Sequence, residues 1–172
     1  EDKFPEVWAD LSFRLADAML KRADSAVDPQ DAPKLLTRSI EVFGSTLIMV
    51  TRETNPQRWA LTQHSLGKAH HHLSNFFPAE EAVPQLFRAI SHLKDALEVR
   101  TKETSISDWT ETTFQFGRAL RVRGSREKGE EALGWLRLSE TAFTKASEYY
   151  TLQNQPERGA ELQQAMSDVL YR

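Results

Sequence analysis

The sequence predicts an all-α protein built from repeated pairs of antiparallel helices. Apolar residues recur at helical spacing between helix-breaking residues, no stretch shows the alternation of a strand, and similar residues recur about every 50 positions. With 172 residues, of which 40% are hydrophobic, the chain can bury a core as one domain or a short repeat array. We therefore expect seven helices that form about three and a half helix pairs.

Proline positions mark the expected helix starts, because proline is tolerated in the first turn of a helix and costs about 3 kcal/mol in its interior. Five prolines are placed as helix starts: Pro5, Pro33, Pro56, Pro84 and Pro156. The seven expected helices cover residues 5–23, 33–53, 56–74, 83–103, 107–123, 130–153 and 156–172. Longer connectors alternate with tight ones along the chain, which indicates that the helices are paired.

An internal repeat is the strongest pattern in the chain. In the second helix of each pair, a spacing of 50 relates Thr51, Thr101 and Thr151; Leu36, Leu86 and Leu136; and Phe43, Leu93 and Phe143. In the first helix of each pair, the matching rows are Trp8, Trp59 and Trp109, and Ala16, Gly67, Gly117 and Ser167. A row of small residues indicates that two helices approach closely there. We therefore expect Gly67 and Gly117 at close helix crossings.

Particular stretches of these copies carry a family resemblance. Trp59-Ala60-Leu61-Thr62-Gln63, followed by Leu66-Gly67-Lys68-Ala69, resembles the first helix of a tetratricopeptide (TPR) repeat. Ala89, Leu93 and Ala96 resemble the second helix, whereas the first copy has Thr46 where alanine is expected. Thr101-Lys102-Glu103-Thr104 with the downstream Trp109 looks like the longer TPR-like repeats of about 50 residues found in bacterial proteins.

The resemblance implies a right-handed solenoid that binds peptides or proteins in a groove lined by the first helices, and it names no partner. It covers nearly the whole chain as a single repeat domain, residues 1–172, with repeats at about 1–53, 54–103 and 104–153 and a partial fourth at 154–172. Because the chain begins at Glu1 without Met and ends inside a helical pattern, we expect it to be a piece of a longer protein.

Composition and motifs argue against several function classes. A formal net charge of −3 argues against general binding of nucleic acid or of an anionic membrane, and the absence of cysteine removes thiolate metal sites. No apolar run approaches the roughly 20 residues of a membrane helix. The P-loop, G-x-G-x-x-G and H-E-x-x-H motifs do not occur, so we expect neither enzymatic activity nor a cofactor. We expect a cytoplasmic location, although the missing start Met is compatible with a removed leader.

A cluster of histidines lies on the third expected helix. His64, His71 and His72 share a face, but seven residues span about 10.5 Å of helix, which is too far for two ligands of one zinc ion. We favour structural or groove-lining roles over a metal site, with a pH-sensitive contact as a further possibility. His70 shares its row with large apolar residues, so we expect it to pack in the core.

The expected groove follows the stripe of the first helices that lies opposite the packing rows. Residues 61, 64, 68 and 71 share one helical face, and adding 50 reproduces that face in the next copy. The centre of the stripe holds the candidate partner-binding residues His64, Lys68, His71, His72, Phe114, Arg118 and Arg121. Basic groups beside an aromatic ring suit an acidic or carboxylate-bearing segment of a protein. Alternatively, the charges in one row pair along the groove: Asp17, Lys68, Arg118 and Asp168.

Two functions are compatible with this pattern. The first is a non-catalytic adaptor or scaffold that binds a protein or peptide in the groove; the second is a structural self-association module within a larger multidomain protein. The groove rows vary between copies while the packing rows hold, which favours the adaptor. Self-association would use an uncovered apolar stripe of Met166, Val169 and Leu170 on the last helix. We expect Tyr149 and Tyr150 to pack on that helix.

Overall fold

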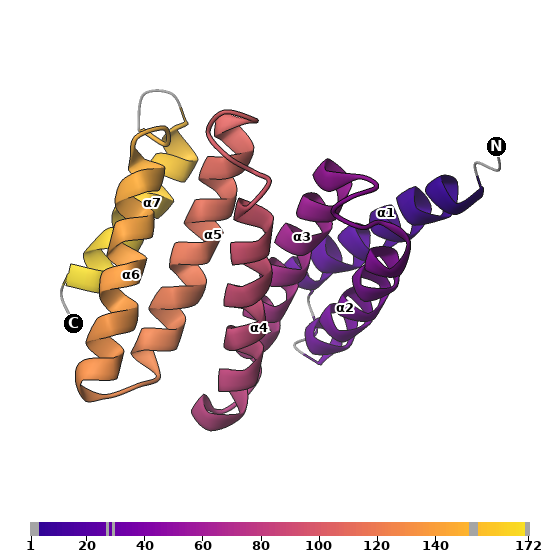
Figure 1. The fold of residues 1–172 in the computed structure, drawn as a ribbon. Helices are drawn as coiled ribbons and strands as arrows, with labels where there is room; N and C mark the ends of the chain where they lie inside the picture. The colour runs from indigo at the N-terminus through magenta and orange to yellow at the C-terminus, as the bar shows by residue number, and fades with distance from the viewer. Residues whose placement is uncertain (1–3, 27, 29, 152–154, 171–172) are drawn as a thin grey trace. The chain divides into compact units, whose positions relative to one another are not determined.

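The computed structural model describes residues 4–26, 28, 30–151 and 155–170, and this part of the chain is all-α (Figure 1). The described residues form seven helices and no strand, which confirms the predicted fold class. The helices are α1 (Phe4–Asp24), α2 (Asp31–Met49), α3 (Pro56–Ser74), α4 (Ala79–Leu97), α5 (Ile106–Ser125), α6 (Gly129–Ser147) and α7 (Pro156–Leu170).

The second helices end earlier than predicted, since α2, α4 and α6 stop at Met49, Leu97 and Ser147 rather than at residues 53, 103 and 153. For α2 and α4 the cause is a threonine turn that follows the helix, and the equivalent residues 152–154 after α6 lie outside the described residues. The Thr51 N–H donates to Thr54 Oγ1 at 3.0 Å, and the Thr54 N–H donates to Thr51 Oγ1 at 3.2 Å. These threonine hydroxyls form hydrogen bonds with backbone N–H groups, and these bonds compete with the backbone hydrogen bonds that would continue the helix. Residues 101–104 form the same turn.

Each threonine turn leads directly into a capped helix. Asn55 accepts a hydrogen bond from the Arg58 N–H at 3.0 Å, and Ser105 accepts one from the Asp108 N–H at 3.3 Å. Such caps satisfy backbone donors that have no partner within the helix. The polar turn motif is therefore a stop signal for one helix and a start signal for the next.

The predicted start at Pro84 is wrong. Helix α4 begins at Ala79, so Pro84 lies in its second turn. Proline there lacks the N–H that would donate to the Glu80 carbonyl, which removes one helical hydrogen bond near the end of the helix. Pro33 is the third residue of α2 and stays within the tolerated first turn.

The chain divides into two compact units, Glu1–Ala96 and Leu97–Arg172, and each is described by itself. In the first unit α2 packs against both α1 and α3, and in the second unit α6 packs against both α5 and α7. Each unit has its own hydrophobic core. Large buried residues of the first core are Phe13, Leu20, Leu36, Phe43 and Leu66. Those of the second core are Phe114, Phe143, Tyr150, Leu162 and Val169.

The two cores repeat the same ring contact at equivalent positions. The ring centroids of Phe13 and Phe43 are 5.4 Å apart, and those of Phe114 and Phe143 are 5.8 Å apart. Tilted aromatic pairs at this separation contribute beyond the apolar area that they bury. The repeat seen in the sequence is therefore also a repeat of packing.

The small-residue row lies at close helix crossings, as predicted. A Cβ added to Gly117 would lie 2.6 and 2.7 Å from two ring atoms of Phe143, and a Cβ on Gly67 would lie 3.1 Å from the Ala89 carbonyl oxygen. The close approach also permits a hydrogen bond between the paired helices. Ser139 Oγ donates to the Gly117 carbonyl at 2.8 Å.

None of the helices formed by the described residues combines the length and the apolar character that would let it cross a membrane.

Candidate functional site

The predicted groove residues of the first unit differ in exposure. The rings of His64 and His71 are buried, whereas His72 and Lys68 are partly exposed. His72 Nδ1 lies 2.6 Å from Asp24 Oδ1, so this histidine ties α3 to the end of α1. Of the four residues, Lys68 and His72 are the ones that present surface in this structure, and contact with a partner there stays a prediction.

Phe114, the predicted groove aromatic of the second unit, is a core residue. Its side chain is 1% exposed, and its ring packs edge-on to Tyr150 at 6.2 Å as well as against Phe143. The Arg118 guanidinium lies 5.9 Å from the Phe114 ring centroid. The buried Phe114 ring therefore contacts the Arg118 guanidinium from the core side. It does not itself offer apolar area to a partner.

The charges along the predicted groove pair differently from the expected row. Asp168 pairs with Arg121 at 3.1 Å, and Asp17 pairs with Lys21 on its own helix at 2.8 Å. Both pairs are partly exposed, and such pairs contribute about 0–1 kcal/mol. Charges are thus neutralised in both units by partners other than those predicted. Asp168 pairs with Arg121, one helical turn from the predicted Arg118. Asp17 pairs within its own helix and not with Lys68.

His70 is a packed core histidine, as predicted. Its ring stacks on that of His92 with a centroid separation of 5.4 Å, and the two Nδ1 atoms contact the side-chain oxygens of Gln85 and Gln63 at 2.7 and 2.6 Å. Burial lowers the pKa of His70, and burial together with the positive charge that His70 and Arg88 can carry lowers the pKa of His92 to about 4. The pairing of His70 with His92 was not predicted from the sequence, because His92 belongs to another helix.

Among the described residues, no group of three or more His, Cys, Asp or Glu side chains could hold a metal ion.

Much of the apolar stripe of the last helix is buried in the core of the second unit. Val169 is buried with Tyr150 and Leu162 in the core of the second unit, and Met166 packs partly buried against it. Tyr149 packs partly buried against this core, and its ring lies 5.9 Å from that of Tyr150. The expected contact with the last helix is therefore confirmed for Tyr150, whereas that of Tyr149 stays a prediction. The side chain of Leu170, the third residue of the predicted stripe, lies outside the described residues.

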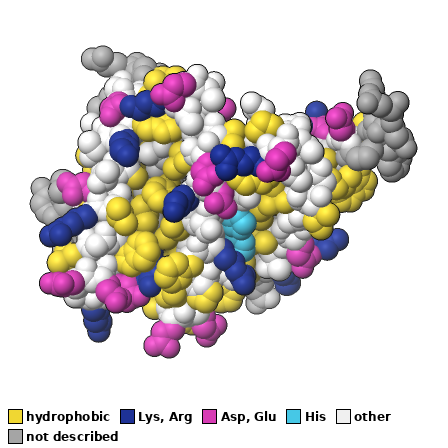
Figure 2. Space-filling model, viewed as in Figure 1, with side chains coloured by type: hydrophobic (Ala, Val, Ile, Leu, Met, Phe, Trp, Pro, Cys, Tyr) yellow, Lys and Arg dark blue, Asp and Glu magenta, His cyan; other side chains and the backbone are white. Residues whose placement is uncertain are grey.

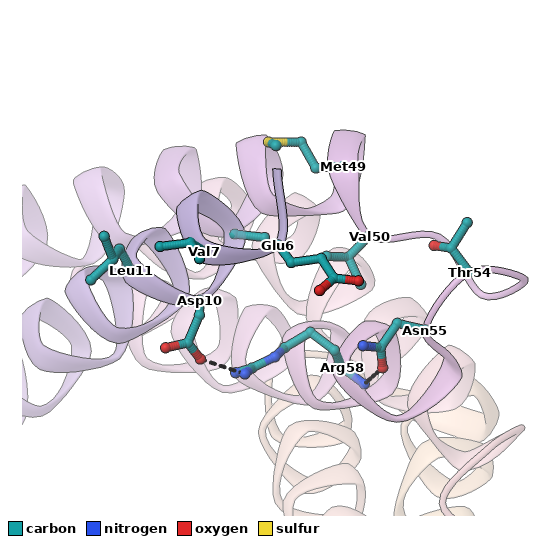
Figure 3. A pocket seen from close by; sticks show the side chains of 10 residues that line it. Glu6, Val7, Asp10, Leu11, Met49, Val50, Thr54, Asn55 and Arg58 are labelled. Carbon is teal, nitrogen blue, oxygen red and sulfur yellow. Dashed lines mark hydrogen bonds and ion pairs between the residues drawn. The ribbon is translucent and has the colours of Figure 1, made fainter. Parts of the chain in front are cut away.

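A pocket of about 510 Å³ lies in the first unit between the start of α1 and the turn that joins α2 to α3 (Figure 3). This volume falls within the range of roughly 300–1,000 Å³ that is typical of ligand sites. The lining is both apolar and polar: Glu6, Val7, Ala9, Asp10, Leu11, Met49, Val50, Thr54, Asn55 and Arg58.

An ion pair fixes the polar wall of the pocket. Figure 3 shows Asp10 of α1 and Arg58 of α3 pointing toward one another, with Arg58 Nη2 at 2.5 Å from Asp10 Oδ1. Arg14 Nε contacts the other carboxylate oxygen at 2.6 Å. Burial raises the pKa of Asp10, but the bonds and charges of Arg14 and Arg58 outweigh it and lower the pKa below its usual value. Asp10 is therefore ionised at neutral pH and can accept further hydrogen bonds.

Beside the pocket, α1 exposes a strip of apolar side chains, which we name the α1 strip: Val7, Leu11 and Leu15. Leu11 is 61% and Leu15 52% exposed. The equivalent residues of α3 are Thr62, 0% exposed, and Leu66, 3% exposed. Positions that are buried in the next copy thus face outward in α1, and contiguous exposed apolar surface of this kind marks interaction sites.

Exposed apolar side chains also occur in the second unit. Figure 2 shows hydrophobic side chains on its visible face, and α6 exposes Leu133 and Leu138. Leu133 lines a pocket together with Glu127, which pairs with Arg123 four residues earlier in the chain. The Asp10–Arg58 pair of the first unit instead joins two helices. The first unit therefore holds the more complete candidate site.

Comparison with models of known protein families, with curated proteins and with solved structures finds no match to this chain. A function for this site is therefore inferred from its residues. A paired carboxylate beside apolar side chains can orient the polar end of an inserted side chain while its apolar part is buried.

The pocket was not predicted from the sequence. The pocket is formed where the end of one helix, a threonine turn and the start of two other helices meet, and periodicity along one helix carries no information about such a junction. One pattern could have indicated it. Leu11 stands in a row with Thr62 and Thr112, so the first copy is apolar where the inner copies are polar.

Proposed function

We propose that this chain is a non-catalytic protein-binding adaptor built from TPR-like repeats, and that the pocket beside the α1 strip is its binding site. The observation that carries the proposal is the mixed pocket of the first unit together with the exposed strip on its rim. Protein-binding sites commonly combine a pocket for an anchoring side chain with surrounding apolar contact area. A cytoplasmic location is part of this proposal, and fractionation of cells that produce the protein would test it.

The helix-pair packing supports the repeat assignment. The Phe13–Phe43 contact recurs as Phe114–Phe143, and the Thr51–Thr54 turn recurs at residues 101–104. A scaffold that repeats its packing while its surface varies is typical of binding arrays.

Self-association through the last helix has less support than the adaptor. Val169 is buried within its own unit, so it does not need a second copy to cover it. The α1 strip has no such cover in the described residues, and its leucines are more than half exposed.

A peptide-display selection tests the proposal. Random peptides of about 16 residues are selected on the immobilised chain, and the affinity of the enriched peptides is measured for wild type, Leu11→Glu and Leu138→Glu. The two leucines have similar exposure, 61% and 53%, so the variants impose a similar change at different places.

We expect Leu11→Glu to weaken binding at least about tenfold, because it places a charge in the apolar rim, and Leu138→Glu to leave binding within about twofold. Circular dichroism confirms that both variants remain folded. Equal affinity for all three proteins, or a selection that enriches no peptide, would contradict the proposed site.

A further inference from the structure

The ion pair of the pocket has an equivalent in the second unit. Asp10 and Glu111 occupy the same position of α1 and α5, and Arg58 and Arg158 occupy the same position of α3 and α7. The Arg58–Asp10 pair lies at 2.5 Å, and the Arg158–Glu111 pair lies at 3.4 Å. The two units therefore hold the same carboxylate–guanidinium pair between the first helices of successive copies.

In the second unit a tyrosine stands against this pair. The Tyr150 hydroxyl donates to Glu111 Oε2 at 2.8 Å, and the Tyr150 ring packs edge-on to Phe114 at 6.2 Å. The neighbouring Tyr149 ring lies 5.9 Å from it. Tyr150 is buried, so the core of the second unit encloses one complete phenol site.

The first unit lacks that tyrosine. The spacing of 100 places Val50 where the second unit has Tyr150, and Met49 where it has Tyr149. Both residues line the pocket, and neither carries a group that could donate a hydrogen bond to Asp10. The pocket thus lies where the first unit has shorter and less polar side chains than the second.

The Asp10 carboxylate can accept one more hydrogen bond, as the equivalent Glu111 carboxylate does. In the second unit, Glu111 Oε2 accepts from the Tyr150 hydroxyl while Arg158 Nη2 stands at 3.4 Å from the same oxygen. Asp10 Oδ1 contacts Arg58 in the first unit, and a carboxylate oxygen has two lone pairs. A phenol hydroxyl can therefore bind to Asp10 without displacing Arg58.

From this correspondence we infer that the pocket of the first unit binds a tyrosine side chain of the protein partner, with the phenol hydroxyl donating to Asp10 and the ring lying against Leu11, Met49 and Val50. The inference rests on the proposed function and names the side chain that anchors the partner. Arg58 already covers the Phe13 ring at 5.1 Å, so the incoming ring lies outside Arg58 and not in the core.

The lining also determines which related side chains are disfavoured. Phenylalanine fills the apolar part but leaves Asp10 without the added donor, and a hydrogen bond to a charged group is among the stronger ones. Phosphotyrosine brings negative charge next to Asp10 and Glu6, which both line the pocket. The site therefore selects unmodified tyrosine.

A titration of the full chain with N-acetyl-L-tyrosinamide, followed by NMR, tests the inference. We expect a dissociation constant of roughly millimolar for so small a probe, with the largest shifts at Leu11, Met49 and Val50. N-acetyl-L-phenylalaninamide should bind about tenfold more weakly. Equal affinity for the two probes, or shifts spread over both units, would overturn the inference.

A filling variant provides an independent readout. Val50→Tyr restores the residue type of the second unit, so it should abolish binding of the tyrosine probe while the chain stays folded. Ile48→Tyr is the matched control, because Ile48 is 82% exposed and does not line the pocket, and it should bind the probe like wild type. Met49→Tyr serves as a second filling variant if Val50→Tyr does not fold. Binding that survives every folded filling variant would contradict the inference.

The two proposals fail in distinguishable ways. If Leu11→Glu weakens binding of the selected peptides but the tyrosine probe does not bind, the adaptor site stands and its assignment to tyrosine falls. If the probe binds in the pocket but no selected peptide depends on Leu11, the pocket accepts a phenol and the adaptor proposal falls.

Discussion

Adding a methyl group at Gly117 should destabilise the protein although alanine is the better helix former. The Cβ of Gly117→Ala would lie 2.6 and 2.7 Å from two atoms of the Phe143 ring and 3.3 Å from Ala142 Cβ. Phe143 is 0% exposed, so its ring has little room to move. Overpacking of this kind costs about 1–3 kcal/mol, and replacing a helical glycine by alanine gains about 1 kcal/mol. The net expectation is a loss of between about 0 and 2 kcal/mol, and a greater loss for Gly117→Leu.

Gly134→Ala is the matched control, because Gly134 lies in α6 and an added Cβ there has no neighbour within 4 Å. This variant should gain about 0.5–1 kcal/mol from helix propensity alone. The free energies of unfolding, measured by urea denaturation of both variants, should therefore differ by about 1–3 kcal/mol. Equal stabilisation by the two substitutions would show that Gly117 does not lie at a tight crossing.

Further predictions concern protonation, capping and surface charge. Because burial lowers the pKa of His92 from 6.5 to about 4, its contribution to stability is complete above pH 6.5 and is lost as the pH falls toward 4. The free energy of unfolding, measured by urea denaturation, should be about 2 kcal/mol lower at pH 5.0 than at pH 7.5 because of this residue. His92→Gln should reduce that difference, and a free energy of unfolding that does not change with pH would contradict the prediction. Asn55→Ala removes the cap of α3 and should cost about 0.5–2 kcal/mol, whereas Asn75→Ala, which removes no side-chain cap, should be nearly neutral. Asp168→Asn breaks a partly exposed pair with Arg121 and should change stability by less than about 1 kcal/mol; a larger loss would show that the pair is structural.

The fold could be predicted in detail because its determinants are local or periodic. Rows such as Gly67 and Gly117 follow from the spacing of the helix pairs, and the structure places both glycines against the neighbouring helix. The helix ends were less predictable. Residues 51–54 are polar or charged and could equally form the exposed last turn of a helix, and only the side-chain bonds of the turn show that the helix has stopped at Met49.

The candidate site was less predictable than the fold. A helical face predicts which residues share a stripe but not how deeply each lies, so Phe114 and His71 were assigned to the groove although both are buried. Burial depends on neighbours from other helices: Phe114 is enclosed by Phe143 and Tyr150. The difference between Val50 and Tyr150 was visible in the sequence, but its meaning depends on the three-dimensional equivalence of the two ion pairs.

Site-specific photo-crosslinking tests the location of the binding site most directly. A benzophenone amino acid replaces Leu11, Lys68 or Leu138 in turn, and each labelled chain is irradiated with a peptide from the display selection. These positions report on the α1 strip, the sequence-predicted groove and the exposed face of α6. We expect the label at position 11 to give the dominant crosslink. A dominant crosslink from position 68 or 138 would contradict this expectation.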